Sequence, residues 1–162
     1  MMTLLPMAAF AADRHASIAV IDKTSVTAGD GSQAKITVYA RNYNNTSDSG
    51  ATINVVSSRP TTDVITAGTM GTDGKQEFKI KSDVVGTARI AVGLGSVEDI
   101  TSYLAGGSNA KSAEEAQIIE VFEINFTSSG VDKVRVTAAT TNVTGTTAAP
   151  ADPTAETTNI TV

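Results

Sequence analysis

The chain has 162 residues, of which 41% are hydrophobic and 18% charged, enough for one ordinary domain but not for two full-sized ones. Its formal net charge of −5 comes without any cluster of Lys and Arg, which argues against nucleic acid as a partner. The absence of cysteine excludes disulfides, thiolate zinc sites and cysteine nucleophiles, and the single His15 cannot form a multi-histidine metal site.

Residues 1–12 have the features of the end of a secretory signal peptide. They read MMTLLPMAAFAA and finish in a small-x-small pattern, Ala9-Phe10-Ala11, of the kind that signal peptidase accepts. We interpret them as a remnant of such a signal, so that the mature chain begins near Ala12 or Asp13 and is secreted. No later window holds the roughly 18 consecutive apolar residues of a membrane-spanning helix, and we expect no transmembrane segment. His15 is expected to be solvated in a mobile terminus.

Short strands separated by turns are predicted along the first half of the chain. Residues 17–22 form a short strand, and 24–31 follow as a turn region. Residues 34–41 alternate between Ile36, Val38 and Ala40 on one face and polar side chains on the other, which indicates a half-buried strand. A polar loop over 42–50 precedes a third strand that includes Ile53 and Val55, and 64–66 supply a weaker one.

The strongest local signal is a hairpin at residues 72–75. Asp73-Gly74 is a dipeptide suited to a tight turn with positive φ. The strand that follows points Phe78 and Ile80 inward, and after Gly86 a further strand alternates Ala88, Ile90 and Val92 with Thr87, Arg89 and Ala91. Strands about ten residues apart predict an all-β antiparallel sandwich, to which 24 Thr and 14 Ser are well suited. We expect its defining turns at Gly31, Gly50, Asp73, Gly74 and Gly86.

Residues 95–117 interrupt the strand rhythm. Ser96 is a candidate helix cap with Asp99 three residues later, and Val97, Ile100 and Leu104 follow at helical spacing. The sequence therefore predicts a short helical insertion near 96–116, with a second helical piece as an option over 109–116. Residues 118–126 then form the most apolar strand, expected to be central or covered on both faces.

The tail contains two similar strand-like segments joined by a loop with Pro150 and Pro153. Two strands alone cannot bury a core. We therefore divide the chain into the remnant 1–12, a sandwich over 13–128, and additional strands over 129–162 that either complete the sandwich or start a second domain.

Several of these segments carry a family resemblance. The turn Asp30-Gly31-Ser32, the strand segments 36–38 and 49–55, and the hairpin unit 72–92 together resemble the invasin/intimin-type bacterial immunoglobulin-like repeat. The resemblance covers about residues 16–93 and implies a seven-stranded immunoglobulin-like sandwich, used as a rigid spacer or adhesive module in surface proteins, surface-layer proteins included. The chain departs from the family pattern at 41–48, where a Gly-Asn-Pro-Val linker is usual, and at the 95–117 insertion.

Three functions follow as hypotheses. The first is a non-catalytic structural or adhesive module of a secreted bacterial cell-surface or surface-layer protein, whose partners are other domains or copies of that protein, or a cell-wall or host-surface ligand. The second is a self-assembling extracellular filament subunit in which a terminal strand, within 131–162, adds to a neighbouring copy. The third is a carbohydrate-binding module, which calls for an aromatic platform, whereas Tyr39, Tyr43 and Tyr103 are the only tyrosines and the chain has no Trp.

Catalysis and cofactors are not expected. The acidic residues Glu114, Glu115, Glu120 and Glu123 are interpreted as solvated charges, and no phosphate loop, nucleophile elbow or helical metal motif occurs. The turn aspartates Asp30, Asp48 and Asp73 are candidates for structural calcium, although none follows a calcium-loop spacing, and ordinary Asx turns explain them as well.

Overall fold

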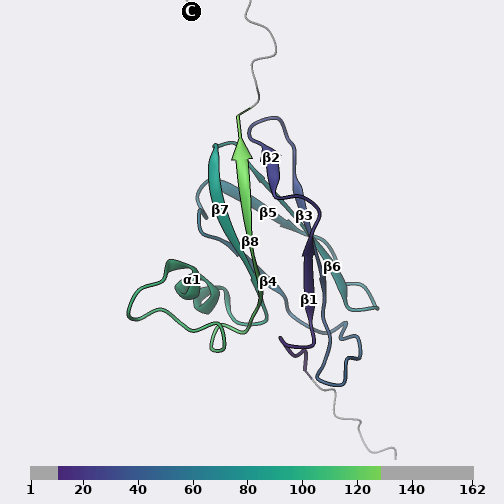
Figure 1. Ribbon diagram of the computed structural model, residues 1–162. Coiled ribbons are helices and arrows are strands. Elements are labelled where there is room, and N and C mark those ends of the chain that lie inside the picture. The colour runs from purple at the N-terminus through teal and green to yellow at the C-terminus, as the bar shows by residue number, and fades with distance from the viewer. Residues whose placement is uncertain (1–10, 129–162) are drawn as a thin grey trace, which may run out of the picture. The chain divides into compact units, whose positions relative to one another are not determined.

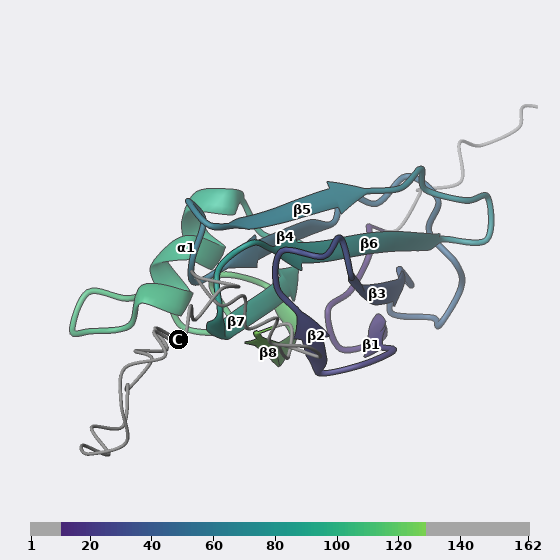
Figure 2. The same ribbon diagram turned by 90° about the horizontal axis from the view of Figure 1, so that it is seen from above.

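Two four-stranded sheets pack face to face in the computed structural model, which describes residues 11–128 (Figure 1). The first sheet has the strand order β1-β3-β6-β5 and the second β2-β8-β7-β4. The strands are β1 (Ile18–Ile21), β2 (Ser25–Thr27), β3 (Ala34–Tyr39), β4 (Asn54–Ser57), β5 (Asp63–Ala67), β6 (Lys75–Ser82), β7 (Gly86–Gly93) and β8 (Ile118–Thr127). Seen from above, the two sheets form separate layers (Figure 2).

The predicted alternation builds the core between the sheets. Ile36, Val38 and Ile80 are fully buried, and Phe78 is 3% exposed. Ala88, Ile90 and Val92 face them from the second sheet, with Ile124 and Phe126 of β8. Because side chains alternate across a strand, the same strands turn their polar residues outward. The inward residues of β3, β6 and β7 are the ones that the sequence predicted.

The two N-terminal strands, β1 and β2, belong to different sheets. β1 pairs antiparallel with β3, whereas β2 runs parallel to the end of β8, with Val26 opposite Phe126. The turn predicted over 24–31 therefore contains a strand, and one pair in the sandwich is parallel. The structure has eight strands where seven were expected, and β1 and β2 each cover an edge of a different sheet.

The helical insertion is confirmed in part. α1 (Val97–Ala105) begins after Ser96, whose hydroxyl accepts a hydrogen bond from the backbone N–H of Asp99 at 3.1 Å. Ile100 and Leu104 are buried, whereas Val97 is 53% exposed. Residues 109–116 form turns and no second helix. Ser112 and Glu115 make the reciprocal hydrogen bonds of a helix start, but Gln117, at a positive φ of 51°, leaves the helical conformation two residues later.

The helix forms a second, smaller core on the outer face of the second sheet. Ile100 and Leu104 pack with Val56 and Ala91, and Ala116 and Ile118 complete the cluster. Ala91, an outward position by strand alternation, is fully buried for this reason. β8 lies between β2 and β7 and is central, as its apolar sequence predicted. No helix within residues 11–128 is long and apolar enough to cross a bilayer.

Candidate functional site

One end of the sandwich holds nearly all of the long connections, and we call it the loop end. It comprises the turn 13–17, the loop 40–53, the turn 68–74 and the insertion 94–117. These segments converge because β1, β4, β6 and β8 start there while β3, β5 and β7 finish there. Both departures from the family pattern, 41–48 and 95–117, therefore lie at the same end (Figure 1).

The loop 40–53 is held by its own side chains. The amide oxygen of Asn42 accepts hydrogen bonds from the backbone N–H groups of Asn44 and Thr46, both at 3.0 Å. Asn45 adopts a positive φ of 61°, a conformation that Asn tolerates. Tyr43, at the tip, is 59% exposed. The loop thus presents an aromatic ring on an ordered turn.

Gly74 joins this loop to the β5–β6 hairpin. Its φ is +73°, and a Cβ at this position would lie 2.7 Å from the carbonyl oxygen of Ala40 and 3.0 Å from the backbone nitrogen of Asp48. The Ala40 N–H donates to the Gly74 carbonyl at 2.8 Å. Glycine is needed here for both conformation and space.

The insertion is tied to its neighbours by backbone and side-chain hydrogen bonds. The side-chain amide of Asn54 donates to the Gly95 carbonyl at 2.8 Å, and the Leu94 N–H donates to the Gln117 carbonyl at 3.0 Å. These bonds bring the two ends of the insertion together beside the start of β4. Because α1 also packs on the second sheet, the insertion is fixed to the sandwich at both its ends and along the helix.

The first described residues are ordered, contrary to the expected mobile terminus. The Asp13 carboxylate accepts hydrogen bonds from the N–H groups of His15 and Ala16, at 2.7 and 3.3 Å, and closes a turn. Arg14 forms an ion pair with Glu114 of the insertion, and His15 Nε2 lies 3.8 Å from a Glu114 oxygen. The turn is held because its side chains find partners on the insertion about 100 residues away, which sequence position alone does not reveal.

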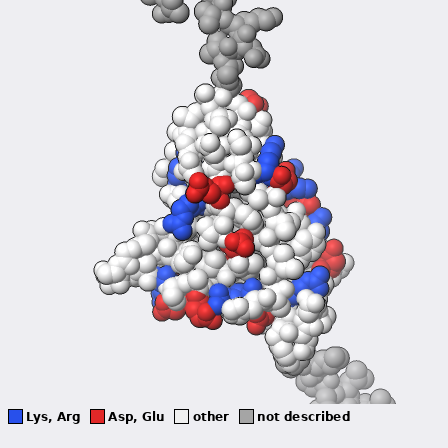
Figure 3. Space-filling view, in the orientation of Figure 1, with Lys and Arg blue, Asp and Glu red and all other residues white. Residues whose placement is uncertain are grey.

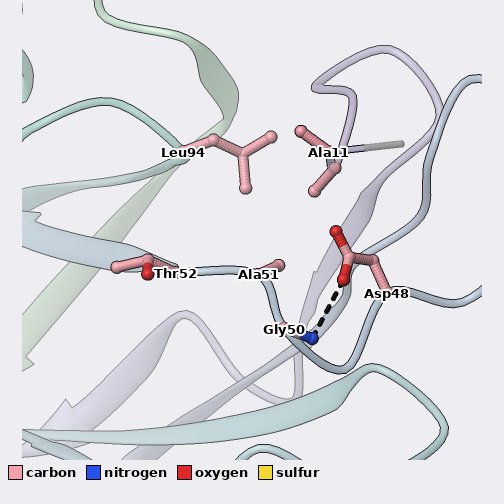
Figure 4. A pocket seen from close by; sticks show the side chains of 7 residues that line it. Ala11, Asp48, Gly50, Ala51, Thr52 and Leu94 are labelled. Carbon is pink, nitrogen blue, oxygen red and sulfur yellow. Dashed lines mark hydrogen bonds between the residues drawn. The ribbon is translucent and has the colours of Figure 1, made fainter. Parts of the chain in front are cut away.

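Two open hollows lie between these segments. One, of about 380 Å³, is lined by Ala11, Ala12, Asp48, Gly50, Ala51, Thr52 and Leu94. Figure 4 shows Leu94 and Ala11 facing each other across it, with the Asp48 carboxylate bonded to the Gly50 N–H at 2.9 Å. The other, of about 500 Å³, is lined by Asp13, His15, Ala16, Ile18, Tyr43 and Asn45. Both hollows are open to solvent, which leaves their lining side chains accessible to a partner.

No catalytic arrangement is evident among residues 11–128. In this range no hydroxyl bonds to the His15 imidazole, and the pairs Ser96–Asp99 and Ser112–Glu115 are local turn contacts. Glu114 pairs with Arg14 and Glu115 with Lys111, and the two glutamate side chains are 72% and 57% exposed. Glu120 and Glu123 occupy different faces of β8. Acidic and basic side chains are interspersed on the surface of Figure 3.

The calcium candidates are not brought to one place. Asp48 and Asp73 lie at the loop end, while Asp30 lies near Ser82, at the other end of β6. Each carboxylate accepts a backbone N–H two residues ahead: Ser32 at 2.7 Å, Gly50 at 2.9 Å and Lys75 at 3.1 Å. The bond to Ser32 lowers the pKa of Asp30 below its ordinary value. Within the described residues no three His, Asp or Glu side chains form a metal cluster.

The other expected turn residues are also placed. Gly31 adopts a φ of +82° beside Asp30, and Gly50 lies in the turn closed by Asp48. Gly86 adopts a φ of +124°, and a Cβ there would lie 3.0 Å from the guanidinium of Arg59. The segment 129–162, with its expected additional strands, and the signal remnant up to residue 10 lie outside the described residues.

The sequence reasoning missed a polar network at the opposite end of the sandwich. The Asp63 carboxylate has no exposed surface and accepts hydrogen bonds from Arg59 Nη2 at 2.6 Å and Ser57 Oγ at 2.5 Å. Arg59 also reaches the Val85 carbonyl and lies 5.1 Å from the centre of the Phe126 ring. An Arg and an Asp four residues apart, beside Pro60 in a link between strands, were the available signal.

Comparisons with known proteins bear on this architecture. No protein-family model matches the sequence, and no curated protein matches it. The fold is similar to that of invasin, a bacterial integrin-binding protein, with a TM-score of 0.53 and 18% identity over 74% of this chain. The chain has the invasin-type immunoglobulin-like fold. It spans about a fifth of the invasin chain, 20%.

Two other adhesins share this invasin-type similarity. The adhesin InvE of Yersinia pseudotuberculosis is 15% identical, with a TM-score of 0.49 over 74% of this chain and 28% of InvE. The Escherichia coli adhesin FdeC is 13% identical, with a TM-score of 0.48 over 81% of this chain and 34% of FdeC. At these identities the likeness concerns the fold alone.

Proposed function

We propose that this chain is a non-catalytic module of a secreted bacterial cell-surface protein, and that it makes adhesive contacts through its loop end. The observation that carries the proposal is the convergence of the ordered loop 40–53 and the insertion 94–117 at one end of an invasin-type sandwich. Binding residues are disproportionately carried by loops on a rigid scaffold.

The surface of the loop end supports this role. Tyr43 is 59% exposed and Val97 53% exposed, although both stand on segments with fixed backbones. Exposed aromatic and aliphatic side chains on an ordered backbone lose little conformational entropy when they are covered by a partner. The partner is a component of a cell surface, either the bacterial wall or a host cell.

The proposal is tested by measuring whether beads coated with the protein are retained on cell surfaces. Beads coated with the full chain are compared for retention on mammalian cells and on isolated bacterial walls, and the pair Tyr43→Ser with Val97→Ser is expected to abolish retention on the surface that is bound. The matched control is Val84→Ser with Val85→Ser, because these valines are similarly exposed, at 47% and 54%, at the opposite end. Equal loss in both variants, or no retention of the unaltered chain, contradicts the proposal.

The filament hypothesis rests on residues 131–162, outside the described range, and it remains a prediction. Light scattering and negative-stain microscopy on the full chain and on a chain ended at Gly130 distinguish it. Polymers that disappear on truncation favour the filament subunit, and monomers in both samples favour the adhesive module.

A further inference from the structure

The outer face of the β1-β3-β6-β5 sheet carries a row of lysines, which we call the lysine face. Alternate outward positions of β6 are Lys75, Glu77, Lys79 and Lys81, and β3 adds Lys35 beside them. Four lysines thus accompany Glu77 on this face, and Asp22, opposite Lys35 at the edge of the sheet, accepts the Lys35 backbone N–H at 2.7 Å. This face therefore carries more basic than acidic side chains, in a chain whose net charge is −5.

The strand register places two of these charges against each other. Lys35 and Lys79 are directly opposite partners in the antiparallel β3–β6 pair. Like charges at opposed positions destabilise a sheet. Glu77 offsets part of this repulsion, since its carboxylate lies 2.9 Å from Lys75 Nζ and 3.5 Å from Lys35 Nζ. In residues 11–128 no carboxylate pairs with Lys79 or Lys81, so the fold carries positive charge that its own stability does not require.

Aromatic and apolar side chains border the lysines. Tyr39 lies between Ile18 and Lys75 in one row across the sheet, and Val20 lies in the next row, beside Thr37. Ile18 and Val20 are 51% and 47% exposed. A ring and aliphatic groups beside ammonium groups suit a ligand that has both apolar C–H faces and anionic groups, as an acidic sugar does.

We propose that the lysine face binds a linear acidic polysaccharide. The lysines of β6 are spread over six residue steps, from Lys75 to Lys81, about 20 Å at the rise of a strand, and form a line rather than a disc. A line of spaced charges fits a chain that bears its carboxylates or sulfates at intervals of a sugar unit or two. This face meets the loop end at Ile18 and Lys75, but Lys79 and Lys81 lie further along β6, so the proposal does not depend on the adhesive contact proposed there.

Other polyanions fit less well. Duplex nucleic acid presents one charge per 1.7 Å and is bound by many cationic contacts, whereas this face offers four lysines on an acidic chain. A membrane surface is bound by apolar side chains that enter the interface. Here Ile18 and Val20 are two aliphatic side chains on an edge strand at one side of the lysines, and among residues 11–128 no exposed Phe accompanies them.

The test measures binding of the full chain to immobilised polygalacturonate and dextran sulfate, with neutral dextran, phosphatidylserine vesicles and duplex DNA in parallel. The variant Lys79→Gln with Lys81→Gln is compared with Lys23→Gln with Arg89→Gln, which removes the same charge elsewhere on the exposed surface. Affinity for an acidic polysaccharide is expected to fall about fivefold in the first variant, to stay within about twofold in the second, and to weaken with salt. Glu77→Gln is expected to raise it.

Several results overturn the proposal. They are equal losses in the two double variants, no binding of either acidic polysaccharide by the unaltered chain, and binding of vesicles or DNA in preference to the polysaccharides. Thermal melting of each variant excludes misfolding as the cause, and Lys79→Arg with Lys81→Arg, which keeps both charges, is expected to retain binding.

Discussion

The buried pair Arg59–Asp63 gives the sharpest prediction about stability. The Asp63 side chain is fully buried, while the Arg59 side chain is 20% exposed. Arg59→Ala removes two hydrogen bonds to that carboxylate, at 2.6 and 3.3 Å, and leaves Ser57 Oγ as its main partner. Breaking one side of such a buried pair costs about 3–5 kcal/mol because the remaining charge is uncompensated.

Urea unfolding of the full chain measures this cost. At an m-value of about 2 kcal/mol/M, the predicted loss moves the midpoint down by roughly 1.5–2.5 M. The matched control is Arg89→Ala, an exposed arginine on β7, with an expected change within about 0.5 kcal/mol. A further check is the double variant Arg59→Ala with Asp63→Ala, whose destabilisation is expected to fall short of the sum of the single effects. The reasoning is refuted if Arg59→Ala costs no more than Arg89→Ala.

Three further predictions follow from the loop end and the lysine face. Gly74 has a φ of +73°, and a Cβ added there would lie 2.7 Å from a backbone carbonyl oxygen, whereas Gly29 has a φ of +78° and a Cβ there would meet no atom within 4 Å. Gly74→Ala is therefore expected to lower the melting temperature more than Gly29→Ala. Leu104→Ala removes a buried side chain from the helix core and is expected to cost about 2–4 kcal/mol in urea unfolding, and a loss under about 1 kcal/mol would show that α1 is not packed there. The hydrogen bond from Lys75 holds the pKa of Glu77 below its ordinary value. The ionised Glu77 therefore stabilises the fold at pH values above its ordinary pKa, and this stabilisation is lost as the pH falls through the lowered pKa. Glu77→Gln is expected to weaken the decline of stability with falling pH, and an unchanged decline would count against the pairing.

Local patterns predicted the sandwich where neighbours in sequence decide the structure. The alternation around Phe78 and Ile80 fixes which face of β6 is buried, and the Asp73-Gly74 turn fixes where the strand begins. Ser96 signalled the start of α1 because a cap acts within three residues. In each case the energy that selects the structure comes from adjacent residues, and one sequence is enough to see it.

Contacts between distant segments could not be predicted in the same way. The three-residue strand β2 exists because Val26 pairs beside Phe126, a hundred residues away. The sequence alone predicts that Ala91 faces outward and that Asp63 is solvated, whereas in the structure α1 covers Ala91 and Arg59 bonds to the Asp63 carboxylate. The convergence of the loop 40–53 with the insertion depends on strand order, so the candidate site was visible in the sequence only as two separate departures from a family pattern.

Site-specific photocrosslinking tests the adhesive role of the loop end most directly. The full chain carries a benzophenone amino acid in place of Tyr43 in one sample and of Val85 in the other, since both side chains are more than half exposed and lie at opposite ends of the sandwich. After irradiation on the cell surface that retains the beads, position 43 is expected to give a covalent adduct with a surface component, and position 85 none. Adducts from position 85 alone, or from both positions equally, would contradict the account.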